Sequence, residues 1–308
     1  MTLLGSLLDR SIVLSFDRTG FWRHARRFES GPHRDLQDRH VLLTGGTSGI
    51  GLEHARALVE HGAAVTTWAR SVPRGEQAAR DVGMRFTSVD LGDLESVRDA
   101  AWALPEQPYS AVVLNAGAMP WERKLTAQGH ELVWASQVLG HLLLLRILRG
   151  RQLLTDDARV IWTSSGGMYT AKLDLRDISR EHEYQRHAVY VHAKRAQVEL
   201  AHHLAERWPE LWHGSMHPGW VDTPAVAHSM PVFRTMTRPI LRTWEQGADT
   251  LTWLVRTDSS PPSGAFWFDR QQAPRHLSAR TQSTPQRIDQ LVDAVFEATQ
   301  PYLEAPDA

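Results

Sequence analysis

Short apolar runs rich in β-branched residues alternate along the chain with longer segments in which apolar residues recur every three or four positions. The short runs predict strands at residues 40–44, 64–68, 85–89, 110–114, 159–164, 212–216 and 265–268. The longer segments predict helices at about 50–61, 93–103, 129–149, 190–207 and 245–256. A last helix is expected after Thr284, a favourable N-cap residue followed by Pro285 in the first turn. The alternation predicts an α/β fold with a Rossmann-type, doubly wound, seven-stranded parallel sheet.

Residues 1–38 precede this pattern and are expected to form an N-terminal helical extension to a single domain at 39–308. The apolar residues of the extension have helical spacing, but they are too few to span a bilayer, which takes ~20 apolar residues, and no signal-peptide pattern accompanies them. Two interpretations stay open. The extension is a helix docked on the body of the protein, or it contacts a membrane surface or a partner through Phe21, Trp22 and the nearby arginines.

The composition is that of a soluble globular protein, with 42% hydrophobic and 22% charged residues. Because 34 basic residues are balanced by 35 acidic ones, no overall positive charge attracts nucleic acid, and a nucleic-acid partner is disfavoured. The absence of Cys excludes disulfides, thiolate catalysis and Cys-bound metals, and it agrees with a cytoplasmic location; membrane association is the alternative. The histidines lack metal-binding spacing, so no metal site is predicted. A homo-oligomer is left open.

A glycine-rich turn follows the first predicted strand and leads into the first predicted helix. Its candidate cofactor-binding residues are Gly45, Thr47, Ser48, Gly49, Ile50 and Gly51. Glycines in such a turn let backbone N–H groups approach a pyrophosphate, which then lies at the positive end of the helix dipole. The position of the turn between strand and helix predicts a dinucleotide site; a simple turn is the alternative.

The end of the second predicted strand distinguishes the two nicotinamide cofactors. An acidic side chain there holds the ribose hydroxyl of NAD, but this chain has Arg70, whose planar guanidinium matches a 2′-phosphate. NADP(H) is therefore predicted in preference to NAD(H), with a surface arginine as the alternative. Asp90, after the third strand, could accept a hydrogen bond from the adenine amino group, and Asn115, Ala116 and Gly117 bring another backbone segment close to the cofactor.

Tyr190 and Lys194 are four residues apart at the start of a predicted helix, which places the phenol and the ammonium on one helix face. A nearby ammonium favours the phenolate and lowers the pKa of the tyrosine toward neutral pH, where it can act as an acid or a base. Lys194 could also bind the nicotinamide ribose. Ser165 directly follows the fifth predicted strand and could stabilise charge on a substrate oxygen, with Ser164 as the neighbouring alternative.

In the order of its motifs, the chain resembles the short-chain dehydrogenase/reductase family over roughly residues 38–270. These motifs are Thr44-Gly45-x-x-x-Gly49-x-Gly51, Asn115-Ala116-Gly117, Ser165, Tyr190-x-x-x-Lys194 and Pro218-Gly219. The resemblance implies hydride transfer between NAD(P) and an alcohol or carbonyl, with Tyr190 as acid/base, Ser165 orienting the substrate and Lys194 binding the ribose. It also implies that Pro218, Gly219, Val221 and Thr223 bind the cofactor at its nicotinamide end. A narrower resemblance, carried by stretches such as Ser215-Met216-His217-Pro218-Gly219-Trp220, is to the branch called dehydrogenase/reductase family member 12.

One position departs from the family pattern. The family has a catalytic Asn that anchors a water in a proton relay with the Lys, and alignment puts Gln137 in its place. Gln keeps the amide but moves it outward by one methylene, and a displacement of about 1 Å can cost ~100-fold where positioning is critical. Gln137 is kept as a catalytic candidate. The departure leaves a second interpretation, an NADP(H)-binding scaffold or sensor with little or no turnover.

Residues 225–233 follow the sixth predicted strand, where a segment of this fold usually lies over the substrate. Their Met, Val and Phe side chains favour an apolar ligand, and core packing is the alternative. The expected partner is therefore a small lipophilic carbonyl or alcohol. A serine hydrolase is disfavoured because Ser165 lacks the Gly on each side that a nucleophile elbow requires.

Overall fold

The computed structural model describes residues 15–28, 31, 33–176 and 184–306. Within this part of the chain the strands are β1 (His40–Thr44), β2 (Ala64–Ala69), β3 (Arg85–Ser88), β4 (Tyr109–Leu114), β5 (Leu154–Thr163), β6 (Trp212–Met216), β7 (Ala265–Phe268) and β8 (Gln271–Ala273). The α-helices are α3 (Arg18–Ala25), α4 (Gly49–Glu60), α5 (Val72–Val82), α6 (Leu94–Trp102), α7 (Leu132–Trp134), α8 (Gly140–Gly150), α9 (Arg186–Arg207), α10 (Pro224–Ser229), α11 (Pro231–Thr237), α12 (Trp244–Arg256) and α13 (Pro285–Thr299).

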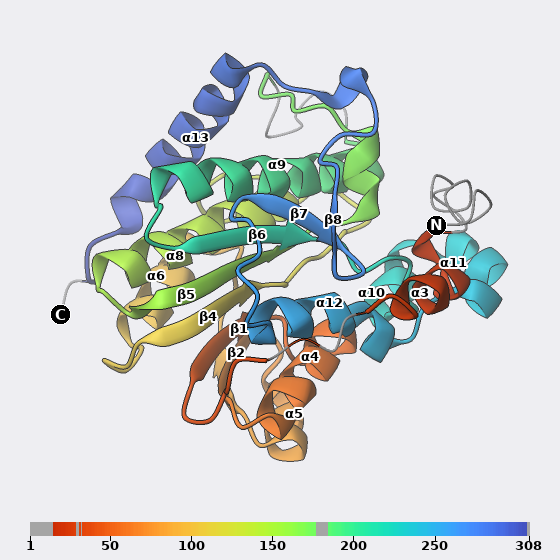
Figure 1. Cartoon of the computed structure of the whole chain (residues 1–308). Coiled ribbons are helices and arrows are strands. Elements are labelled where there is room, and N and C mark those ends of the chain that lie inside the picture. The colour runs from red at the N-terminus through yellow and green to blue at the C-terminus, as the bar shows by residue number, and fades with distance from the viewer. Residues whose placement is uncertain (1–14, 29–30, 32, 177–183, 307–308) are drawn as a thin grey trace.

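The strands form one sheet in the order β3-β2-β1-β4-β5-β6-β7-β8, and neighbouring strands are parallel except for β7 and β8. The strand order reverses between β1 and β4, so the loops that follow these two strands diverge and open a crevice at the carboxyl edge of the sheet. Figure 1 shows α4, α5 and α12 on one face of the sheet and α6, α8 and α9 on the other. The predicted doubly wound fold is confirmed.

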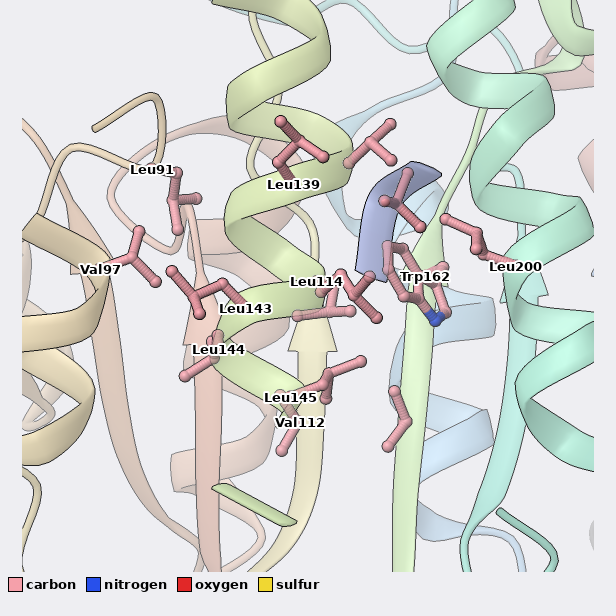
Figure 2. Packing of buried hydrophobic residues seen from close by; sticks show 14 of the residues in the cluster. Leu91, Val97, Val112, Leu114, Leu139, Leu143, Leu144, Leu145, Trp162 and Leu200 are labelled. Carbon is pink, nitrogen blue, oxygen red and sulfur yellow. The ribbon is translucent and has the colours of Figure 1, made fainter. Parts of the chain in front are cut away.

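Both faces of the sheet are buried, because the strands carry near-continuous apolar runs rather than alternating ones. Figure 2 shows one of the two core layers, where Leu143 of α8 lies near Leu114 of β4, and Leu200 of α9 lies beside Trp162 of β5. On the other face, Leu58 of α4 belongs to a second apolar cluster, to which α12 and the opposite sides of the strands also contribute. These two core layers fix the position of the carboxyl edge of the sheet, where the crevice opens.

The segment 132–150 is long and apolar enough to cross a membrane, but 78% of its most apolar window is buried inside the protein. It is a core helix of the layer in Figure 2. Between α7 and α8 the helix widens into one π-helical turn, Ala135–Leu139. Such turns change which groups the backbone carbonyls can reach, and they are frequent at functional sites.

The structure contains a strand, β8, and three helices, α5, α10 and α11, that the sequence pattern did not predict. The sheet has an eighth strand, β8, because Asp269 and Arg270 both adopt positive φ, 47° and 58°, and turn the chain back on β7. Hairpin turns of this kind favour Asn and Gly, so the Asp-Arg sequence gave no turn signal. Helix α5 was also not predicted. It buries only Gly75, Ala78 and Val82, which form a weak apolar stripe.

The described part of the N-terminal extension is held by a buried ion cluster. Arg242 pairs with Asp269 through two contacts of 2.6 and 2.8 Å, and His24 Nδ1 lies 2.6 Å from the same carboxylate. The Arg242 guanidinium also donates to the backbone carbonyls of Ser15 and Asp17. Residues 15–28 are therefore docked on the body of the protein. The apolar residues Leu3, Leu4, Leu7, Leu8 and Ile12 lie outside the described residues.

Replacing Asp269 with Asn should lower the free energy of unfolding by about 3 kcal/mol or more, because the buried Arg242 guanidinium loses its counter-charge. Asp249→Asn is the matched control, since Asp249 pairs with Arg270 nearer the surface, where an ion pair contributes about 1 kcal/mol or less. Urea unfolding of the two variants measures the difference. Equal losses would contradict the clamping role.

Candidate active site

A cavity of about 600 Å³ lies at the carboxyl edge of the sheet, where the strand order reverses. The predicted site residues that line it are Gly45, Thr47, Ser48, Gly49, Ile50, Gly51, Arg70, Asp90, Asn115, Ala116, Gly117, Ser165, Tyr190, Lys194, Pro218, Gly219, Val221 and Thr223. All the predicted site residues lie in the described part of the chain, and among them Gln137 alone does not line the cavity. Seven stretches of sequence thus meet at one place.

The turn between β1 and α4 fits the pyrophosphate of a dinucleotide. Gly45 adopts a positive φ of 75°, and a Cβ added to Gly51 would lie 2.2 Å from the Gly45 carbonyl oxygen, so a side chain at position 51 would disrupt the turn. Ser48 is the N-cap of α4 but makes no side-chain capping hydrogen bond. The first N–H groups of α4 are therefore open to an anion at the positive end of the helix.

Two arginines line the end of the cavity that lies beside β2. They are Arg70, which follows β2, and Arg74, in the first turns of α5. Both side chains are exposed, and neither guanidinium has an ion-pair partner in the described part of the chain. Arg74 escaped the sequence analysis because α5 itself was not predicted. The spacing of four residues from Arg70 is the signal that could have found it.

The Thr44 hydroxyl fixes the loop after β4. Its oxygen accepts hydrogen bonds from the backbone N–H groups of Asn115, at 2.9 Å, and Ala116, at 3.1 Å. The Asn115 side-chain amide in turn donates to the carbonyls of Thr44 and Gly45 at 3.3 Å. These bonds hold two of the cavity walls together, and they leave the Gly117 backbone beside Lys194. Asp90 accepts from the Gly92 N–H at 2.9 Å, which orients its carboxylate at the cavity wall.

Ser165, Tyr190 and Lys194 meet in the cavity between β5 and α9. The Ser165 hydroxyl is close enough to the Tyr190 phenol to lower its pKa, and the Lys194 ammonium lies 5.5 Å from the centroid of the Tyr190 ring. The neighbouring Ser164 hydroxyl is buried and donates to the backbone carbonyl of Lys194 at 2.8 Å, so this alternative candidate is held in a structural role. Tyr190 keeps part of its surface open to the cavity.

Burial dominates the protonation of both α9 residues. It raises the pKa of Tyr190, and the nearby Ser165 hydroxyl opposes this effect. Lys194 was expected to lower the pKa of the phenol. Its ammonium instead donates to the Thr163 carbonyl at 2.8 Å, so it is turned toward the end of β5. Burial lowers the pKa of Lys194 to about 7, which places its charge change near neutral pH.

Gln137 lies behind the cavity wall in the π-helical turn. Its side-chain N–H donates to the Ala118 carbonyl at 2.7 Å, and the side-chain oxygen is buried without a hydrogen-bond partner. That oxygen lies 3.1 Å from where a Cβ of Gly117 would stand. The Gln137 amide thus bonds the loop after β4, and no hydrogen bond joins it to Lys194. A catalytic role for Gln137 stays a prediction.

The other end of the cavity is formed largely by the segment predicted to cover the substrate. Val226, Met230 and Phe233 of this segment line it, together with Met119 and Trp220. Val226, Met230 and Phe233 are each only partly buried, so core packing does not explain these side chains. His187, which also lines the cavity, lies one turn before Tyr190 on α9, and the sequence analysis did not single it out.

The site combines a phosphate-binding turn and an open helix N-terminus with a Ser, a Tyr and a Lys at the reversal point of a parallel sheet. These features define a dinucleotide-dependent oxidoreductase, because the cradle fits the cofactor and the three side chains can move or orient a proton beside it. Comparisons with known proteins define the family.

The model of the NAD dependent epimerase/dehydratase family matches residues 41–211. The Bos taurus protein "Dehydrogenase/reductase SDR family member 12" is 36% identical over 272 residues, which cover 84% of this chain and 86% of that protein. Homo sapiens "Retinol dehydrogenase 12" is 30% identical, with 82% and 84% covered. A solved "short chain dehydrogenase/reductase family protein" has a TM-score of 0.60 at 26% identity, covering 76% of this chain and 96% of its own.

The chain belongs to the short-chain dehydrogenase/reductase family. It is an NAD(P)-dependent oxidoreductase that acts on CH–OH or C=O groups. The resemblance stated from the motifs is confirmed.

Replacing Tyr190 with Phe should lower kcat by about 10²–10⁴-fold, because the substrate oxygen loses its proton donor, while the dissociation constant for NADPH stays nearly unchanged. Tyr184→Phe is the control, since the Tyr184 hydroxyl donates to the Pro120 carbonyl and does not line the cavity. Stopped-flow reduction and NADPH fluorescence titration measure the two constants. A Tyr190→Phe enzyme as active as the Tyr184→Phe enzyme would refute the assignment.

Proposed function

We propose that this protein transfers hydride between NADP(H) and a lipophilic carbonyl or alcohol. The observation that carries the proposal is the continuity of one cavity, from two arginines at one end, past Ser165 and Tyr190, to apolar side chains at the other. A dinucleotide and a substrate can therefore share the cavity with their reacting ends beside the phenol.

The preference for NADP(H) rests on Arg70 and Arg74. Two exposed guanidinium groups, which have no carboxylate partner among the described residues, are available for a 2′-phosphate, and each can bind it through a planar pair of donors. No acidic residue takes the position after β2 that would hold a free ribose hydroxyl. The charge at this end of the cavity thus favours the phosphorylated cofactor.

Each residue of the reacting centre has a separate task. When bound, NADP(H) supplies or accepts the hydride. Tyr190 gives a proton to the substrate oxygen or takes one from it, and Ser165 orients both the phenol and that oxygen through its hydroxyl. Lys194 presents a positive charge beside them and lines the cavity, where its remaining N–H would donate to the ribose of a bound cofactor.

The lipophilic substrate is inferred from the lining of the second half of the cavity. Met119, Met230 and Phe233 supply adaptable apolar surface, and Trp220 adds an aromatic wall. A relative named for retinol, a lipophilic alcohol, agrees with this class. Exposed Val232 and Met236 of α11 extend the apolar surface outside the cavity.

The function is tested by following NADPH consumption with retinoid, steroid, lipid-aldehyde and quinone substrates. We expect at least one lipophilic carbonyl to be reduced by the wild type and not by Tyr190→Phe. Saturable NADPH binding without reduction of any substrate would favour the alternative function, an NADP(H)-binding scaffold or sensor. That alternative arises because Gln137 stands where the family has a catalytic Asn.

Arg70→Asp should weaken NADPH binding relative to NADH by about 10–100-fold, because a charge-assisted contact to the phosphate is replaced by repulsion. Arg74→Asp should act in the same direction. Arg80→Asp on the same helix is the control, since Arg80 bonds Gln77 and does not line the cavity. The ratio of the two dissociation constants is the measurement; a ratio that Arg70→Asp leaves unchanged would remove the basis for the preference.

A further inference from the structure

One buried side chain outside the predicted site connects Lys194 to the π-helical turn behind the cavity. Gln197 lies three residues beyond Lys194 on α9 and has no exposed surface. The Lys194 ammonium donates to Gln197 Oε1 at 3.1 Å, and Gln197 Nε2 donates to the backbone carbonyl of Gln137 at 2.7 Å. A lysine only donates and a carbonyl only accepts, so these two contacts fix the orientation of the amide.

The carbonyl that holds Gln197 belongs to a longer hydrogen-bonded chain. It also accepts from His141 Nδ1 at 3.1 Å, so the proton of this neutral imidazole is on Nδ1. His141 Nε2 then accepts from the Thr44 hydroxyl at 3.0 Å, and the Thr44 oxygen holds the loop of Asn115. Gln197 is therefore the residue through which this series of hydrogen bonds, which starts at the loop of Asn115, reaches Lys194.

We propose that Gln197 is a positioning residue for hydride transfer, whose side-chain amide holds the Lys194 ammonium in place and stabilises its positive charge. Two of the three ammonium donors are taken, one by the Thr163 carbonyl and one by Gln197, and the third is left for the cavity. The inference rests on the proposed role of Lys194 in the reaction.

The surroundings of Lys194 make its charge depend on the contact with the neutral Gln197 amide. The titratable groups that face the ammonium are Tyr190 on the same helix and His141 on α8. Lys194 has no ion pair within the described residues, so carbonyl and amide oxygens alone accept its charge there. Because burial already brings the pKa of Lys194 to about 7, the loss of one acceptor should change the charge of the site at neutral pH.

Two substitutions of similar size should shift the lysine in opposite directions. Gln197→Met removes both amide contacts and should lower the titration midpoint of Lys194 by about one pH unit or more. Gln197→Glu places a carboxylate beside the ammonium and should raise the midpoint by about one unit or more. A purely structural role would not give opposite signs, and a variant that unfolds would move Lys194 toward the exposed value near ~10.4 in both cases.

Lysine NMR measures this midpoint directly and needs no turnover. The chain has only Lys124, Lys172 and Lys194, and the first two are exposed, so ¹³Cε-lysine labelling of the full chain gives a short, assignable spectrum. Lys194→Arg identifies the signal. Gln290→Met, at an exposed position on α13, is the matched control and should leave the midpoint unchanged.

The pH profile of kcat for carbonyl reduction should follow the NMR midpoints, with its alkaline limb moving down in Gln197→Met and up in Gln197→Glu. Midpoints that stay at the wild-type value, or that move in the same direction in both variants, would overturn the positioning role. If the midpoints move as expected but the wild type reduces no carbonyl, Gln197 still holds the Lys194 ammonium in place, but its role in hydride transfer fails together with the proposed function. If the wild type is active and the midpoints stay fixed, Gln197 alone is wrongly assigned.

Discussion

The site depends on the buried Lys194 ammonium, which has no carboxylate partner in the part of the chain that the structure describes. The cost of removing Lys194 from water is met by fixed neutral oxygens, from Thr163 at the end of β5 and from Gln197 on α9. This arrangement requires α9 to pack closely on β5 and β6, where Ser164 bonds the Lys194 carbonyl and locks the helix to the strand end. The same packing brings Tyr190 to Ser165. The core layer of Figure 2 thus sets the position of the reacting groups as well as the stability of the fold.

The two ends of the cavity differ in how far their polar groups are exposed to water. At the end lined by Arg70 and Arg74, exposed arginines and a helix N-terminus without a side-chain cap offer charge and donors to an anion, and contact with water costs them little. At the reacting end the groups are buried, so each hydrogen bond and each charge has a larger effect on its neighbours. The reversal of the sheet between β1 and β4 places these two environments along one crevice.

Much of this arrangement could be predicted from sequence. The strands could be predicted because a parallel sheet that is covered on both faces needs continuous apolar runs. Gly45 and Gly51 could be predicted as parts of the turn because the turn has no room for side chains at these positions. Arg74 was missed because α5 was not predicted: of its three buried residues, Gly75, Ala78 and Val82, only Val82 has a sizeable apolar side chain. Gln197 gave no signal, since a glutamine on a helix is ordinary until the fold brings the Gln137 carbonyl against it. The directions of Lys194 and of the Gln137 amide depend on long-range contacts with Thr163 and Ala118, which no local pattern contains.

The most direct test of the account is the fate of the hydrogen on C4 of the cofactor. With NADPH deuterated at a single C4 position, mass spectrometry of the alcohol product shows whether the cavity holds cofactor and substrate in one fixed orientation. The account predicts deuterium in the product from one C4 position and not from the other, because a cofactor bound through both the phosphate turn and Lys194 presents a single face. Product without deuterium from either position, or with equal labelling from both, would contradict it.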